Sequence, residues 1–201
     1  MTGAGIALYA FGGKGASGNV VLNDVVKVSD EKVYLVRDRT VTVLDVAQQK
    51  ATKTIVLSSV FLTEGESPSD PGEFLKATVL SPDGQKLYML YSGEGNSKIV
   101  SIDTATDSLI QSSGFPASTI PFGTDIEISN DGSKLFVGAV NSDQFATVST
   151  QDGASVINTL ASPFSDMTMS PSGNTLYISK AFQTDTYYIA KLDPSTGIID
   201  E

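Results

Sequence analysis

Three carboxylate residues stand where they could do chemistry: Asp125, Glu127 and Asp166. Asp125 and Asp166 each lie four residues before a serine, Ser129 and Ser170, in two similar stretches of sequence. Side chains two positions apart in a strand share a face, so Glu127 joins Asp125 on its side of the strand. Converging carboxylates can bind a hard divalent cation such as Ca²⁺ through oxygen, or supply acid–base chemistry when one of them has a raised pKa.

Other kinds of catalytic site are excluded by composition. The chain of 201 residues contains no Cys and no His. A disulfide, a thiolate nucleophile, a Ser-His-Asp triad and an H-E-x-x-H zinc site are therefore absent. We expect no cofactor other than a divalent cation at the three carboxylates.

A glycine motif near the N-terminus needs a separate explanation. Gly13, Gly15 and Gly18 have the G-x-G-x-x-G spacing of a dinucleotide site. Such a site requires a helix after the third glycine, because the helix N-terminus receives the phosphates. Here "NVVLNDVVKV" follows Gly18, and its β-branched residues favour a strand. We predict a loop or hairpin turn that binds no nucleotide.

The charge and hydropathy of the chain limit its partners. With 23 acidic and 13 basic residues the net charge is −10, and no basic stripe is available to follow phosphates. Nucleic acid is therefore a poor candidate partner. No stretch approaches the roughly 18 to 20 apolar residues of a membrane span, so we expect no membrane insertion.

The sequence repeats. "SPDGQKLYML" at 81–90, "SNDGSKLFVG" at 129–138 and "SPSGNTLYIS" at 170–179 share a serine, a turn with Gly at its fourth position, and an alternating strand. "SDEKVYLV" at 29–36 is a shortened version of the same unit. A short strand precedes each serine, and two more strands follow the aromatic strand. Four short antiparallel strands in about 40 to 50 residues are typical of one β-propeller blade.

We therefore predict an all-β fold with about four propeller blades of four antiparallel strands each. The approximate blade boundaries are 24–75, 76–123, 124–164 and 165–201, preceded by N-terminal strands and the glycine-rich loop at 1–23. In each blade the leucine and the aromatic residue at the start of the second strand, such as Leu87 and Tyr88, point to opposite faces and pack against the two neighbouring blades. The turn glycines Gly84, Gly132 and Gly173 suit a positive φ.

The units resemble a known family. "SPDGQKLYML…KIVSIDTATDSLI" is similar to the YVTN-type β-propeller repeat, which lactonase-like and cytochrome d1-like propellers share in looser form. The resemblance covers about residues 24–201 and is best in the second unit. The third unit departs from it with "VSTQDGA" in place of the Ile-Asp turn, and the first lacks the Pro and Gly. The resemblance is specific for fold and weak for function.

The sequence is compatible with two arrangements of the blades, a closed ring and an arc. The N-terminal strand at 6–11 or 20–22 could complete the last blade of a small four-bladed ring, or the chain could be an arc completed by another chain or by further sequence. The fourth unit stops at "STGIIDE", where its outer strand begins, and this favours the arc. An arc exposes apolar blade faces and sheet edges, so we expect a protein partner or self-association.

In a propeller the first strand of each blade lines the central channel, which would bring Asp125, Glu127 and Asp166 together. Asp24 lies five residues before Ser29, one position off this alignment. The expected role of these residues is that of solvated acids at strand ends; a metal site is the alternative. A second candidate for binding is the inter-blade segment 58–74, which carries Glu64, Glu66, Asp70, Glu73, Phe61 and Phe74.

The expected function is a non-enzymatic β-propeller module for protein binding or structure. A Ser-, Thr- and Gly-rich all-β chain without Cys favours an extracellular, cell-surface or virion setting over the cytoplasm. The alternative is a lactonase-like propeller hydrolase that uses channel carboxylates and a divalent metal. The absence of His, and of Arg near the channel motifs, favours the first of these.

Overall fold

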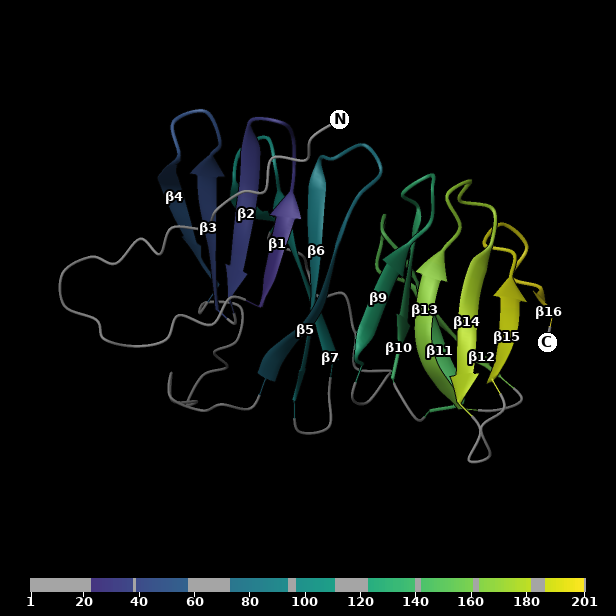
Figure 1. The fold of residues 1–201 in the computed structure, drawn as a ribbon. Coiled ribbons are helices and arrows are strands. Elements are labelled where there is room, and N and C mark those ends of the chain that lie inside the picture. Colours follow the sequence, from purple (N-terminus) through teal and green to yellow (C-terminus); the bar gives the residue numbers. More distant parts are fainter. Residues whose placement is uncertain are drawn as a thin grey trace.

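The computed structural model describes residues 23–37, 39–57, 73–93, 97–110, 123–139, 142–160, 163–181 and 187–200 (Figure 1). These residues form four separate four-stranded antiparallel sheets and no helix. Each sheet is a meander in which sequential strands pair with one another. The predicted all-β propeller fold is confirmed.

The sixteen strands divide into four blades of four. The first blade comprises β1 (Asp24–Lys27), β2 (Lys32–Arg37), β3 (Thr40–Asp45) and β4 (Lys50–Val56). The second comprises β5 (Glu73–Leu80), β6 (Lys86–Gly93), β7 (Ser97–Asp103) and β8 (Ser108–Ile110). The third comprises β9 (Asp125–Ile128), β10 (Lys134–Gly138), β11 (Gln144–Ser149) and β12 (Ser155–Thr159). The fourth comprises β13 (Phe164–Met169), β14 (Leu176–Ala181), β15 (Tyr187–Leu192) and β16 (Ile199–Asp200).

The blades follow one another in chain order through their first strands, since β1 contacts β5, β5 contacts β9, and β9 contacts β13. The purple and blue first blade lies at the left of Figure 1 and the yellow-green fourth blade at the right. Within the described residues the four sheets do not close into a ring. The blades therefore form an arc.

Side-chain hydrogen bonds of a serine stabilise the turn between the first and second strands of a blade. In the second blade the Ser81 hydroxyl donates to Asp83 at 2.6 Å and accepts from the Lys86 backbone N–H at 2.8 Å. Ser129 makes the same pair of bonds in the third blade, to Asp131 at 2.6 Å and from Lys134 at 2.9 Å. Ser81 and Ser129 thus stabilise the turns that begin their motifs.

Gly173 shows why this turn requires glycine. Its φ of +71° lies in the left-handed region, where a side chain is strained. A Cβ built on Gly173 would also lie only 1.9 Å from the Asn130 Cβ of the preceding blade. The predicted positive φ is confirmed here and at Gly84 and Gly132, both at +70°.

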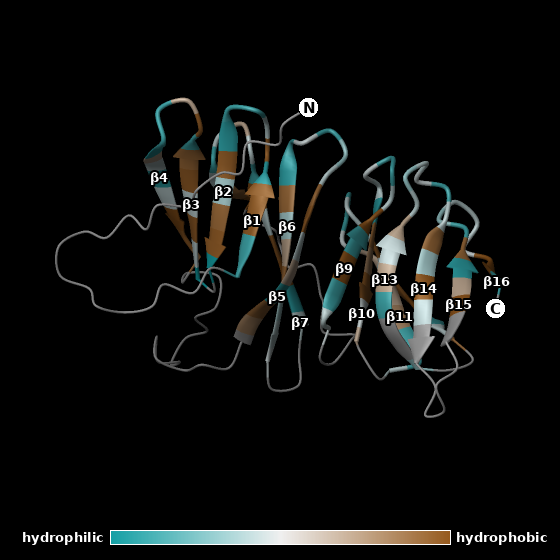
Figure 2. Ribbon diagram, in the orientation of Figure 1, coloured by the Kyte–Doolittle hydropathy of each residue, from teal (hydrophilic) through white to brown (hydrophobic). Residues whose placement is uncertain are grey.

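The hydrophobic core lies between consecutive blades in three clusters, one for each junction. Leu87 packs against the first blade, whereas the neighbouring Tyr88 packs against the third, as the alternation predicts. In Figure 2, β2 is brown over most of its length, whereas β9 alternates brown and teal. A fully buried side chain of this size contributes about 1.5 to 3 kcal/mol, so the junctions account for much of the stability.

The aromatic position at the start of the second strand is buried wherever a blade follows. Tyr34, Tyr88 and Phe136 are each at most 2% exposed, in the first, second and third blades. Tyr177, the same position in the fourth blade, is 37% exposed. The fourth blade therefore carries junction-type side chains on the face directed away from the third blade. Among the described residues, no further blade covers that face.

Candidate functional site

The three carboxylates predicted from the sequence lie at the junction of the third and fourth blades. Asp125 and Glu127 occupy alternate positions of β9 and are half-buried, and Asp166 is an exposed residue of β13. β9 and β13 contact each other, and the charge of Asp166 acts on both Asp125 and Glu127. The three carboxylates therefore lie close enough for their charges to interact.

The Asp125 carboxylate is used in structural hydrogen bonds. One oxygen, Oδ1, accepts from the backbone N–H of Ile126 at 2.9 Å, within its own strand. The other, Oδ2, accepts from the backbone N–H of Met167 at 2.9 Å, across the junction to β13. Burial raises the Asp125 pKa, and the nearby Asp166 charge adds to the rise, while both backbone donors oppose it. Asp125 joins two blades.

Glu127 is the most strongly perturbed of the three groups. Burial is the main cause that raises its pKa to about 7, and the negative charge of Asp125 adds to the rise. The backbone N–H of Met169 in β13 donates to Glu127 and acts in the opposite direction. A carboxyl group with a pKa near neutrality can exchange a proton at physiological pH, which is the property required of a general acid or base.

Asp24 has the same role in the first blade as Asp125 has in the third. Asp24 Oδ1 accepts from the backbone N–H of Val25 at 2.7 Å, and its Oδ2 accepts from the Thr78 hydroxyl of the second blade. Thr78 and Met167 are at equivalent positions, because each pairs with the residue after the second-strand aromatic, Met89 and Ile178 respectively. Two of the three junctions thus contain the same carboxylate contact.

The alignment on serine missed this equivalence. In the first blade the residue that takes the place of Ser81 is Val28, whose N–H donates to the Lys32 carbonyl as that of Ser81 donates to Lys86. Ser29 therefore lies one position later than the other serines. An alignment on the aromatic residues misses it too, because the first hairpin is one residue shorter before Tyr34 than the third is before Phe136. Strand pairing shows the equivalence, since Asp24 and Asp125 each pair with the residue two after the aromatic.

The carboxylates do not form a preassembled metal centre. Across the described residues, no group of three or more His, Cys, Asp or Glu side chains is arranged to hold a metal ion. Both oxygens of Asp125 already accept backbone hydrogen bonds, which leaves few lone pairs for a cation. The Ca²⁺ site at Asp125, Glu127 and Asp166 stays a prediction.

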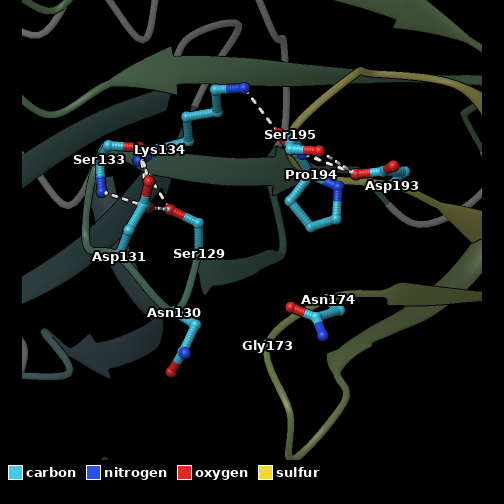
Figure 3. Close-up of a pocket in the computed structure, with 10 residues that line it drawn as sticks. All are labelled: Ser129, Asn130, Asp131, Ser133, Lys134, Gly173, Asn174, Asp193, Pro194 and Ser195. Atoms are coloured by element: carbon cyan, nitrogen blue, oxygen red, sulfur yellow. Dashed lines mark hydrogen bonds between the residues drawn. The ribbon is translucent and has the colours of Figure 1, made fainter.

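A polar groove of about 530 Å³ lies near this junction, between the serine turn of the third blade and the β15–β16 turn of the fourth (Figure 3). Lys134 spans it, and its Nζ donates to the Pro194 carbonyl at 2.6 Å. Asp131 and Asp193 carry hydrogen bonds from neighbouring serines, which lower the pKa of each to about 2. A carboxylate with so low a pKa is a weak base, so the Ser129–Asp131 pair is a poor catalytic pair.

The sequence did not indicate the groove, because its two sides come from turns far apart in the chain. Its lining residues are Ser129, Asn130, Asp131, Ser133, Lys134, Gly173, Asn174, Asp193, Pro194 and Ser195. The signal that could have found it is the recurrence of a lysine at the start of the second strand. Lys32 reaches the Thr104 carbonyl of the next blade at 2.8 Å, just as Lys134 reaches Pro194.

Two other sequence predictions fall mainly outside the described residues. The Gly13-Gly15-Gly18 loop lies there, and so do Phe61, Glu64, Glu66 and Asp70 of the inter-blade segment. At the end of that segment Phe74 is exposed, and the Lys76 ammonium lies 5.8 Å from the centre of its ring. In the described part of the chain, no helix is long and apolar enough to cross a membrane.

Comparison with known proteins shows the fold without a family. No family model matches the chain, and no curated protein matches it. Among solved structures, hydrazine synthase from Kuenenia stuttgartiensis is similar over 92% of this chain and 51% of its own, with 17% identity and a TM-score of 0.63. A protein from Lactobacillus plantarum is similar over 89% of this chain and 53% of its own, with 18% identity and a TM-score of 0.62.

A calcium-binding protein, regucalcin, from Agrobacterium tumefaciens is similar over 88% of this chain and 58% of its own, with 15% identity and a TM-score of 0.58. This chain thus spans about half the length of these three solved chains. Identities this low show a shared fold alone. The chain has the fold of β-propeller proteins.

Proposed function

We propose that this chain is a non-catalytic β-propeller module that acts through protein–protein contacts. The observation that carries the proposal is the use of Asp125 and Asp24 as junction residues, with carboxylate oxygens bonded to the next blade. Both aspartates therefore stabilise contacts between neighbouring blades. The exposed junction-type face of the fourth blade provides a surface for a partner.

The finer family assignment is also a proposal. The Ser-Pro-Asp-Gly turn at 81–84 and the Ile-Asp strand end at 102–103 support membership of the YVTN-type propellers. In this turn the Ser81 hydroxyl donates to Asp83, and Asp83 also accepts from the Gln85 backbone N–H. The motif residues therefore stabilise the turn itself. An extracellular, cell-surface or virion location is supported by composition alone, and immunolabelling of intact cells or particles tests it.

The second candidate is a lactonase-like hydrolase that uses a divalent metal. It is favoured by Glu127, whose pKa of about 7 suits a general base, and by the similarity to a protein described as calcium-binding. It is opposed by the hydrogen bonds that occupy Asp125 and by the lack of a preassembled ligand group in the described chain.

An assay of small-lactone hydrolysis separates the two functions. The 201-residue chain is incubated with lactones of different ring size, with Ca²⁺, with Mn²⁺ and with a chelator. The proposal predicts no turnover above that of the Glu127→Gln variant under any condition. Metal-dependent turnover that is lost in Glu127→Gln would establish the hydrolase instead.

A further inference from the structure

The two ends of the arc carry complementary blade faces. The trailing face of the fourth blade is the one that contains Tyr177, and paired strands place four further residues on it: Asp166, Ile189, Lys191 and Asp200. Ile189 is 61% exposed, whereas Phe145, its equivalent in the third blade, is fully buried against the fourth. Register also makes Asp166 equivalent to Asp24 and Asp125, since each pairs with the residue two after the aromatic.

The leading face of the first blade is the opposite half of such a junction. Val25 pairs with Leu35, the residue after the aromatic, and so corresponds to Thr78 and Met167. Those two residues donate to the aspartate of the preceding blade. Val25 is 47% exposed, and Val56 on the same face is exposed as well. Val25 thus stands where a preceding blade would dock, with its own backbone N–H donated to Asp24.

The charges on the two faces are opposite. The leading face carries Arg37 and Lys27, at positions where the second blade has Tyr91 and Leu80, and Lys27 forms an ion pair with Asp30 at 2.7 Å. The trailing face carries Asp166 and Asp200 against one Lys191. Opposite charges on docking faces favour association and orient the partners. The charged residues at these positions distinguish the two end faces from the apolar junctions inside the arc.

We infer that a second copy of this chain docks head to tail on these faces, so that two four-bladed arcs close one eight-bladed ring. The inference rests on the proposed interaction role and names its partner. Contact between a leading and a trailing face is heterologous, and such contacts form a closed ring when the rotation completes a circle. Propellers contain four to eight blades, so two copies reach the upper limit and three exceed it. In the ring, Tyr177 and Ile189 of each copy would be buried against the first blade of the other.

Native mass spectrometry of the 201-residue chain tests the ring. We expect a species of twice the 21.1 kDa chain mass. Ile189→Glu on the trailing face and Val25→Glu on the leading face should each weaken dimerisation by about tenfold or more, because each places a charge in an apolar contact. Val156→Glu, at a 64% exposed position on the outer strand of the third blade, is the matched control and should leave the dimer intact.

Mixing the two end variants gives the decisive result. A head-to-tail pair retains one junction with both faces intact, so equal amounts of Ile189→Glu and Val25→Glu should recover dimers that neither forms alone. A monomeric or larger wild-type species overturns the inference, and so does a dimer that either end variant leaves unchanged. These outcomes do not bear on catalysis, which the lactone assay tests separately.

Discussion

The Asp125 carboxylate and the Met167 backbone N–H lie 2.9 Å apart and join the first strands of the third and fourth blades. Asp24 and Thr78 make the corresponding contact between the first and second blades. The second blade has Ala77 at this position, which pairs with Leu90, so its junction with the third blade depends on apolar packing. The arc therefore combines a repeated hydrophobic contact with a carboxylate contact that two of its junctions use.

The stability of the chain should depend on pH through Glu127. Its pKa of about 7 in the folded chain lies above the ordinary 4.5, so the folded chain holds a proton that the unfolded chain has lost between these values. The contribution of this group is complete below pH 4.5 and is lost as the pH rises through 7. Urea unfolding between pH 5 and about 8 should show the wild type losing more stability than Glu127→Gln.

The other acidic residues titrate in the same way in the wild type and in Glu127→Gln. The difference between the two curves isolates Glu127. Parallel curves for the wild type and Glu127→Gln would show that this carboxyl group is ionised throughout the range.

Gly173→Ala should be among the more damaging glycine substitutions. The new Cβ would lie 1.9 Å from the Asn130 Cβ, at a φ of +71°. The left-handed conformation costs about 1 to 2 kcal/mol for an alanine, and overpacking adds about 1 to 3 kcal/mol. Thermal or chemical unfolding measures the total.

Gly197→Ala is the matched control, because its φ is +74° and nothing lies within 4 Å of the added Cβ. It should show the conformational cost alone. Asn130→Gly in the Gly173→Ala background should recover the part due to the clash. Equal destabilisation by the two alanine variants would mean that Gly173 is required only for its backbone conformation.

Calcium should not change the thermal midpoint of the wild-type chain if the carboxylates are junction residues. A ligand that binds only the folded state at a hundredfold above its Kd would stabilise it by about 2.7 kcal/mol, which is easily seen in a melting curve. A shift with calcium that is absent in the Asp125→Asn, Asp166→Asn double variant would establish the metal site instead.

Much of the fold could be predicted because each blade repeats local signals. The serine turns, the turn glycines and the alternation of Leu87 with Tyr88 depend on residues close in sequence, and the structure confirms them. The clustering of Asp125, Glu127 and Asp166 followed from the same repeat. Their hydrogen bonds did not, because the Met167 and Met169 donors belong to the backbone of another blade, and a backbone donor leaves no trace in residue identity.

The register of the first blade could not be predicted from its serine. Ser29 stands three residues before Lys32, whereas Ser81 stands five before Lys86, so the first hairpin has a shorter turn. A shorter turn moves the serine relative to the paired strands without changing the strands themselves. The aromatic residue does not correct the error, because the shortened turn lies between it and the first strand, and the equivalence of Asp24 with Asp125 is visible only in the strand pairing.

The free energy of unfolding of Asp125→Ala and Asp24→Ala, measured against Asp143→Ala, tests the central claim most directly. Asp143 is an exposed acid of the third blade and should tolerate the change. Loss of a junction hydrogen bond should cost about 1 to 2 kcal/mol in each of the first two variants, because both leave a backbone or hydroxyl donor without its carboxylate. Wild-type stability in Asp125→Ala and Asp24→Ala would contradict the claim that these carboxylates hold the blades together.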